Sequence, residues 1–451
     1  MPGILNTSSL FSGQGIDVGS VVSQLVSAAR APEAAWQNQQ QTLQTQESSL
    51  TQLNSELSAL QTAVESLKDT NGGLGAVTTT SSNSSIATIS AAAGTPPGSH
   101  SVVVNNVATT SSYYTAPVAT SDTTLANGSF ALQIGTGSPT TITIDSTDNT
   151  LTGLAANING MNLGVTANVI TDASGARLSL VAQSSGSASD LTISGDTTSL
   201  GFTKAAPGLN ASLTVDGVPV SSATNTVTGV IPGVTFNLTG SDPTTTVNLG
   251  VSANTDSAVQ AINNFVNAYN SVIADLNSQF TYNATTQSSG PLSGDGTARM
   301  VEEQILGFAG YSVSGTGSIQ TLRSLGINMN DDGTLTVDSA ALNNAVSSNY
   351  QDVQNFFQST SGFATYLDGQ LSQLTDPTQG AFYLDLKGAQ ATVQGLQDQI
   401  DSFETYIATQ QQQWTTQYNQ INVLLQEFPL LQQITDAQLG LPLQSSANGH
   451  V

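Results

Sequence analysis

The stretch that decides the fold is residues 393–428, which read VQGLQDQIDSFETYIATQQQQWTTQYNQINVLLQEF. Apolar residues recur there at alternating steps of three and four, which is the seam of a coiled coil rather than the broader stripe of a globular helix. The seam consists of Val393, Leu396, Ile400, Phe403, Ile407, Trp414, Ile421, Leu424 and Phe428, with Gln410 and Gln417 interrupting it. The pattern predicts one long helix, about 54 Å at 1.5 Å per residue.

The same spacing appears near the other end of the chain, in residues 33–68. Its seam consists of Trp36, Gln39, Leu43, Gln46, Leu50, Leu53, Leu57, Leu60, Val64 and Leu67. Two glutamines again lie close to a tryptophan, and they either fix the register of a helix pair or are merely tolerated there. Because the two stretches match in length and seam, we expect them to pack against each other as a leg.

The composition excludes several classes of function. The 31 acidic and 7 basic side chains give a net charge of −24, so no basic patch is available for nucleic acid or an anionic membrane surface. The absence of cysteine excludes disulfides and thiolate metal sites. The two histidines, His100 and His450, lie in unrelated contexts, and no nucleophile and base stand together. We therefore expect neither an enzyme nor a cofactor nor a metal site.

One short stretch imitates a metal site. Asn328, Asn330, Asp332 and Gly333 resemble the first half of a calcium loop, but Ser339 would occupy the position of its final glutamate. A tight turn is the expected structure.

The N-terminus shows no targeting or membrane segment. Residues 1–17 have neither a basic region nor an apolar run, so a cleaved signal peptide is not expected. No apolar run in the chain is long enough to span a bilayer. Asp17 is placed to cap a short helix over residues 18–30, and Pro32 separates this helix from the long one.

The middle of the chain changes from helical to strand-like patterns, so the expected fold is multi-domain α+β. Paired terminal helices would form a leg, with two nested β-rich domains inserted between them. The expected segments are 1–35 (mobile, with a short helix), 36–75 (leg), 76–121 with 206–252 (β domain), 122–205 (inserted β domain), 253–428 (helical leg) and 429–451 (mobile tail). Pro429 is expected to end or kink the last helix.

Several motifs follow one another in a fixed order over nearly the whole chain. They are residues 11–17 (FSGQGID), 21–26 (VVSQLV), 150–159 (TLTGLAANIN), 164–167 (GVTA), 231–238 (IPGVTFNL), 265–270 (FVNAYN), 290–295 (GPLSGD), 325–327 (LGI) and 332–337 (DGTLTV). Together they resemble the flagellar hook-associated protein 2 family, the filament-capping proteins.

This resemblance implies a structural protein that assembles with itself as a ring of about five copies. It would lie at the tip of the bacterial flagellum, exported by the flagellar type III system without a cleaved signal peptide. It would promote insertion and polymerisation of flagellin and prevent its leakage. Its other implied partners are hook–filament junction proteins and an export chaperone on the C-terminal helix.

Candidate contacts with filament subunits are apolar residues of the terminal helices, which have little else to bury against. They are Ile16, Val18, Val22, Leu25, Val26, Ile421, Leu424 and Leu425. Trp36, Trp414, Phe428 and Leu431 either face another subunit or pack within the leg, and packing is favoured.

Two alternatives stay open. The chain is a surface adhesin that binds host glycans or mucin through loops of residues 122–205, or another axial subunit such as a flagellin. The helical segment 254–374 argues against a flagellin.

Overall fold

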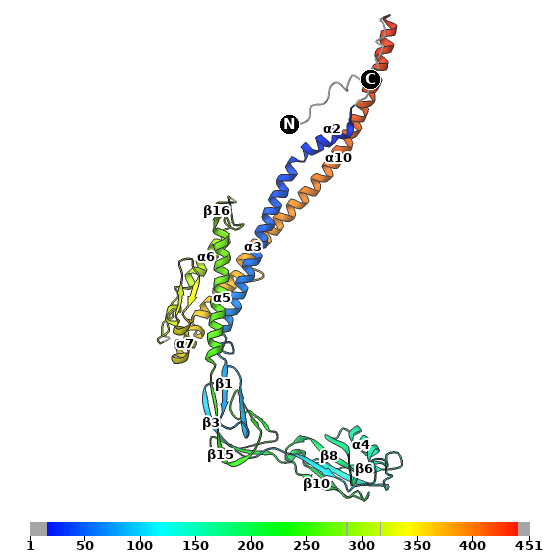
Figure 1. Cartoon of the computed structure of the whole chain (residues 1–451), viewed down its shortest axis with the longest axis vertical. Coiled ribbons are helices and arrows are strands. Elements are labelled where there is room, and N and C mark those ends of the chain that lie inside the picture. Colours follow the sequence, from blue (N-terminus) through cyan, green and yellow to red (C-terminus); the bar gives the residue numbers. More distant parts are fainter. Residues whose placement is uncertain (1–15, 286, 316, 441–451) are drawn as a thin grey trace.

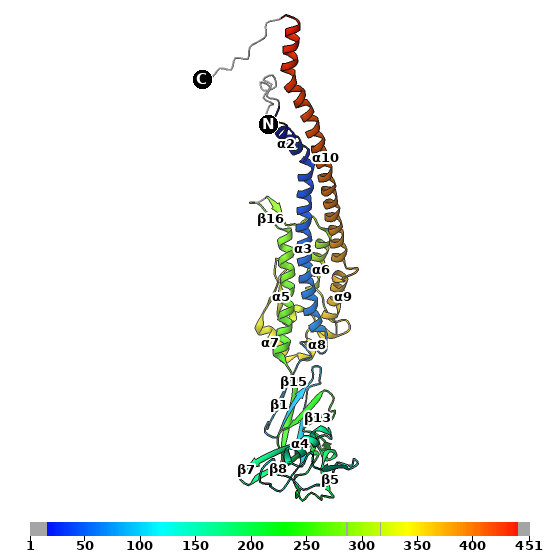
Figure 2. The same cartoon turned by 90° about the vertical axis from the view of Figure 1, so that its right-hand side faces the viewer.

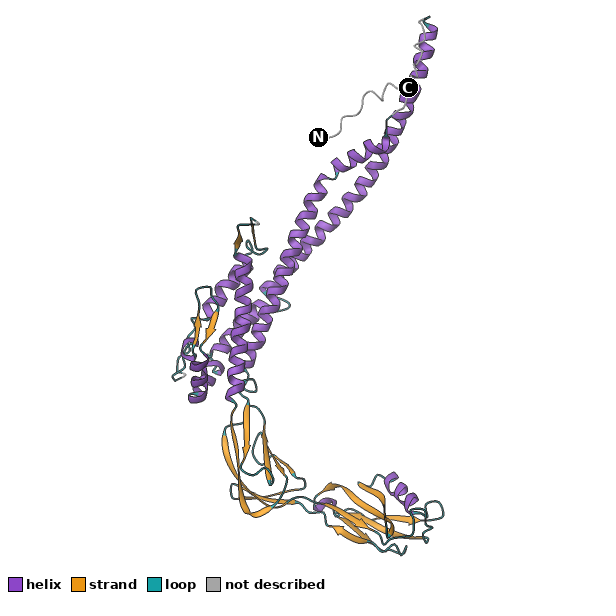
Figure 3. Ribbon diagram, in the orientation of Figure 1, coloured by secondary structure: helices purple, strands orange, loops and turns teal. Residues whose placement is uncertain are grey.

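The computed structural model describes residues 16–285, 287–315 and 317–440. The molecule is elongated: a helical leg leads to an inner β domain, from which an outer β domain extends sideways (Figures 1 and 3). The leg helices are α2 (Val18–Ala29), α3 (Ala31–Lys68), α5 (Thr255–Phe280), α6 (Gly296–Phe308), α7 (Ser339–Ser348), α8 (Tyr350–Gln358), α9 (Phe363–Thr375) and α10 (Ala381–Gln438). None of the described helices combines the length and apolar character that a membrane crossing needs.

The lower half of α3 lies in a helix bundle rather than against α10. Its buried apolar residues, Leu50, Leu53, Leu57, Leu60, Val64 and Leu67, share one core with those of α5 and α9. Figure 2 shows α3 between these helices. The expectation that the whole seam of residues 33–68 faces the C-terminal helix is therefore wrong. The wide apolar face of α5 competes for the same leucines, and only the upper half of α3 remains for α10.

The upper half of α3 and α10 form an antiparallel pair. Trp36 meets Phe403 edge to face, with ring centroids 5.2 Å apart. Farther along, the Gln40 side chain donates to Gln397 Oε1 over 2.8 Å, and the Gln390 side chain donates to Glu47 Oε1 over 2.9 Å. Along these contacts the residue numbers increase in α3 and decrease in α10, so the two helices run antiparallel.

Helix α10 is longer than predicted at both ends. It begins at Ala381 and continues through Pro429 to Gln438, so Pro429 does not end it. Proline removes one amide donor, whose usual acceptor is the Leu425 carbonyl, and water can bind that carbonyl because the surrounding surface is open. The start of the predicted tail is thus helical, whereas residues 1–15 and 441–451, predicted to be mobile, lie outside the described residues.

The inner β domain packs two antiparallel sheets around one apolar core. The five-stranded sheet has the order β1 (Val77–Ser81), β15 (Asp242–Ala253), β3 (Gly98–Asn106), β11 (Ala211–Val215) and β12 (Val218–Ser222). The three-stranded sheet has the order β13 (Thr226–Thr228), β14 (Val234–Leu238) and β2 (Ala87–Ala91). Alternating buried and half-buried residues on β11 and β14 match a strand with one face toward a core.

The outer β domain has its own core and one helix, α4 (Leu151–Gly160). Its four-stranded sheet has the order β10 (Thr203–Ala206), β4 (Thr110–Tyr114), β8 (Gly175–Ser185) and β7 (Val165–Asp172). Its three-stranded sheet has the order β6 (Thr140–Ile144), β5 (Gly128–Ile134) and β9 (Leu191–Ser194). A short 3-10 helix, η1 (Ser187–Ser189), precedes β9. Strand β4, which the sequence placed in the first β domain, pairs with β8 and β10, so the boundary at 121/122 is too late. The pairing partners are distant in sequence and leave no local signal.

Short elements complete the leg. They are the 3-10 helix η2 (Leu322–Leu325) and the hairpins β16 (Tyr282–Asn283) with β17 (Ser288–Ser289) and β18 (Ile327–Met329) with β19 (Leu335–Val337).

Candidate interaction surface at the terminal helices

Helix α2 bends away from the upper end of α3 and lies against α10 (Figure 1). Asp17 caps it, as predicted, by accepting from Ser20 N over 3.2 Å. Just before the cap, Ile16 N donates to the side chain of Asn422 over 2.7 Å. The two termini are therefore tied together where α10 leaves the rest of the leg.

The eight predicted contact residues divide into two groups. On the N-terminal side, Val22 is buried, and Ile16, Val18, Leu25 and Val26 are half-buried. Because α2 lies on α10, these residues take part in packing within the chain.

The C-terminal members are more open. Leu425 is half-buried, but Ile421 is 44% exposed and Leu424 65% exposed. Phe428 and Leu431 are exposed too, so the favoured packing of these two within the leg does not occur in the single chain. Trp36 does pack within the leg, against Phe403, and Trp414 is half-buried.

Beyond α2, α10 continues as a single helix without a neighbouring helix beside it (Figure 1). The exposed apolar residues of this segment are Ile421, Val423, Leu424, Phe428, Leu430, Leu431 and Ile434, with Leu439 directly after the end of the helix. At 100° per residue, the line through Ile421 and Phe428 lies on one side, and Val423, Leu430 and Ile434 lie nearly opposite. The sequence prediction followed only the first line and missed the second. A helix that is apolar on both sides is normally buried on both.

Electrostatics contribute little to this surface. Between residues 405 and 438, the only charged side chains are Glu427 and Asp436. At the other end of α2, Arg30 pairs with Glu33 at 2.8 Å and lies 3.8 Å from Glu404, which fixes the turn between α2 and α3. The exposed end of α10 therefore offers mainly apolar and uncharged polar side chains.

Of the seam glutamines, which were expected either to fix the register or to be merely tolerated, Gln46 has its partner elsewhere in the leg. Gln46 donates to the carbonyl of Pro291 over 3.1 Å, outside α10. The amide pair that does join α3 and α10 is Gln40 with Gln397, which apolar spacing alone does not single out. The role of Gln39, Gln410 and Gln417 in register stays a prediction.

The other candidate sites take structural roles. Asn330 and Gly333 form a tight turn between β18 and β19, with Asn330 N bound to the Thr334 carbonyl at 2.8 Å. His100 binds Asp216 at 2.8 Å, and this hydrogen bond, with that from Ser101 N, lowers the pKa of the Asp216 carboxyl. Among the described residues, no three His, Asp or Glu side chains gather where a metal ion would fit.

Comparisons with known proteins point to one family. Family models match residues 14–111, as the flagellar hook-associated protein 2 N-terminus, and residues 208–428, as its C-terminus. The B-type flagellar hook-associated protein 2 of Pseudomonas aeruginosa is 30% identical over 353 residues, which cover 71% of this chain and 73% of that protein. Flagellar hook-associated protein 2 of Escherichia coli O157:H7 is 28% identical over 447 residues, which cover 93% and 95%.

A solved structure agrees with the sequence matches. The crystal structure of the D1-D2-D3 domains of the flagellar cap protein FliD from Escherichia coli aligns with a TM-score of 0.61 and 27% identity, covering 76% of this chain and 99% of that one. The interval between the two family models, residues 112–207, falls almost entirely on the outer β domain.

Proposed function

This chain belongs to the flagellar hook-associated protein 2 family, and on that premise we propose that it caps the distal tip of a bacterial flagellar filament. There it promotes the insertion and polymerisation of exported flagellin and prevents flagellin from leaking away. In this role it acts as a structural protein and not as an enzyme.

The observation that carries the proposal is the unpartnered end of α10. Exposed apolar residues on both sides of one helix leave a large surface that needs a partner in the working assembly. In the proposed cap, α2 and the end of α10 contact filament subunits. The leg reaches downward, and the two β domains form the plate of a ring of about five copies.

The low charge of this end suits a cap that must move as subunits enter. Uncharged contacts break without leaving a buried ion unpaired, so the end can release one subunit and dock on the next. The same apolar surface would be held by an export chaperone before the chain passes through the type III system. Hook–filament junction proteins would be the first partners, before any filament exists.

Substitutions on α10 test the proposal, because its exposed apolar residues are not needed for the fold of the single chain. We expect the triple variant Leu424→Gln, Phe428→Gln, Leu431→Gln to leave the circular dichroism spectrum and melting temperature unchanged. In a strain lacking the natural protein, it should release flagellin monomer into the medium and build short filaments or none.

A matched control changes the polar face of the same helix segment: Asn419→Ala, Gln426→Ala, Gln433→Ala. This variant should support filaments of normal length. Normal filaments with the apolar triple variant would contradict the proposed docking surface, and so would normal tip assembly after deletion of residues 1–35.

The adhesin alternative remains a prediction without a supporting observation. It would depend on loops of residues 122–205 and not on the terminal helices. A variant lacking the outer β domain separates the two functions, because adhesion would be lost while docking by α2 and α10 could persist.

A further inference from the structure

The junction between the inner and outer β domains has no apolar core of its own. The buried residues of the two domains form separate clusters, and the chain crosses between them twice, at 107–109 and 207–210. Two domains joined in this way are ordinarily expected to move relative to each other. The hydrogen bonds at this junction argue otherwise.

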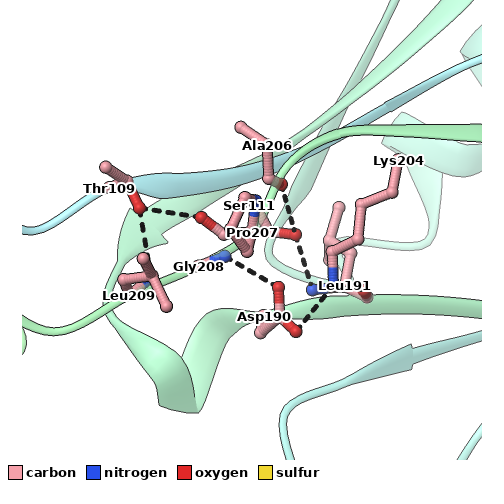
Figure 4. Close-up of polar contacts among 9 residues, drawn as sticks. All are labelled: Thr109, Ser111, Asp190, Leu191, Lys204, Ala206, Pro207, Gly208 and Leu209. Carbon is pink, nitrogen blue, oxygen red and sulfur yellow. Dashed lines mark hydrogen bonds and ion pairs between the residues drawn. The ribbon is translucent and has the colours of Figure 1, made fainter.

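The two connecting segments are paired with each other. Thr109 N donates to the Leu209 carbonyl over 3.0 Å, and Leu209 N donates back over 3.3 Å. The Thr109 hydroxyl also donates to the Pro207 carbonyl over 2.7 Å, as Figure 4 shows. The segments are therefore a short two-stranded bridge rather than two independent linkers.

A clasp on the outer domain, residues 185–190, closes over this bridge. The Asp190 carboxylate accepts from Gly208 N and from Lys204 Nζ, each over 2.7 Å (Figure 4). Gly186 N donates to the Thr109 carbonyl over 3.1 Å. Both connecting segments are thus bound by the same short stretch of the outer domain.

The clasp also reaches the inner domain itself. Ser187 N donates to Asn210 Oδ1 over 2.8 Å, directly before β11. The Ser185 hydroxyl donates to the carbonyl of Ala223, between β12 and β13, over 2.7 Å. The contact with Ala223 connects the clasp to the inner domain at a residue outside the two crossings.

The base of the clasp is anchored in the outer domain. The Ser111 side chain is fully buried, donates to the Ala206 carbonyl over 3.3 Å and accepts from Leu191 N over 2.9 Å (Figure 4). This hydroxyl joins β4, β9 and the end of β10, so the clasp moves with the sheets behind it.

Two glycines permit the close approach. A Cβ on Gly186, whose φ is +97°, would lie 2.9 Å from both the Ala223 carbonyl and Asn210 Oδ1. A Cβ on Gly208 would lie 2.7 Å from the Gly186 carbonyl oxygen. Backbone meets backbone at both positions, so a larger residue must push the clasp away from the bridge.

We propose that this clasp locks the two β domains into one rigid arm, in which the outer domain keeps a single direction relative to the inner domain. Lost hydrogen bonds or an added methyl group at the glycines would turn the junction into a hinge.

Distance measurements on the full chain test this. Because the chain has no cysteine, Val218→Cys on the inner domain and Ile170→Cys on the outer domain, both exposed positions, provide two unique labelling sites. Pulsed electron spin resonance between nitroxides there should give one narrow distance distribution. With Gly186→Ala added, we expect the distribution to become at least twice as wide.

The control is Gly195→Ala, because Gly195 also has a positive φ (+62°) but has nothing within 4 Å of its Cβ position. It should keep the narrow distribution. If Gly186→Ala fails to fold, Asp190→Ala takes its place, with Asp196→Ala as control, since Asp196 binds Thr198 within its own loop. A broad distribution in the unmodified chain, or an unchanged one in folded Gly186→Ala or Asp190→Ala, would overturn the proposal.

Discussion

Truncation of Leu57 separates the bundle in the structure from the helix pair that the apolar seam suggests. Leu57 is 0% exposed, lies in the lower half of α3 and shares its core with α5 and α9. Leu57→Ala removes buried carbon atoms and leaves a cavity, which costs about 2–5 kcal/mol in such sites. The lower bound corresponds to a roughly 30-fold change in an opening equilibrium.

Hydrogen exchange is the suitable assay, because a multi-domain chain does not unfold in one step. We expect amides of α5 and α9 to exchange at least about 30-fold faster in Leu57→Ala, while β3 and β8 keep their protection. The control Leu384→Ala changes a leucine that is 58% exposed on α10 and should cost no more than about 0.5 kcal/mol. A cost below about 1 kcal/mol for Leu57→Ala, or faster exchange in α10 with α5 and α9 unchanged, would refute the bundle assignment.

Three further predictions concern polar groups. Hydrogen bonds from the Thr244 and Thr245 hydroxyls hold the pKa of the Asp242 carboxyl down to about 2. This carboxylate therefore stabilises the folded state above the ordinary pKa of 3.8, and the stabilisation is lost as the pH falls to 2. A carbon-13 titration that gives a pKa near 3.8 would contradict this. Burial raises the pKa of Tyr269 to about 12, so the melting temperature should fall as the pH rises from 10 to 12. In Tyr269→Phe, which has no ionisable hydroxyl, the melting temperature should fall less over the same range. The Asn270 side chain binds both the carbonyl and the amide of Leu335, at 2.8 and 2.6 Å. Asn270→Ala should therefore lower the free energy of unfolding by about 1–3 kcal/mol and speed hydrogen exchange of the Leu335 amide. Unchanged protection of this amide would contradict the prediction.

The helices whose apolar residues recur at a regular spacing could be predicted from the sequence. Alternating steps of three and four marked α3 and α10, and Asp17 marked the start of α2. The spacing of the seam does not indicate which helix each leucine contacts, because Leu57 can pack against the apolar face of α5 as well as against that of α10. The sequence does not show where the outer domain begins, because β4 is defined by its pairing with β8, about 65 to 75 residues away along the chain.

The candidate surface was predictable only on one side of α10. Ile421 and Leu424 follow the spacing of the seam, whereas Val423 and Leu430 break it. The clasp at residues 185–190 had no signal at all. It is made of serine, glycine, alanine and aspartate, which are common in any loop. Its role is visible only from the hydrogen-bond partners that the fold brings next to it.

The nesting of the three parts has a consequence for how the chain acquires its structure. Residues 110–206 form a contiguous unit, and their first and last strands, β4 and β10, are neighbours in one sheet. Once that unit forms, it brings the two halves of the inner domain together, and the inner domain in turn brings α3 to α5. Each stage therefore closes a short effective loop instead of one of more than a hundred residues, which lowers the entropy lost. The chain is thus expected to fold from the middle of its sequence outward, with α10 joining α3 last, regardless of which terminus emerges first.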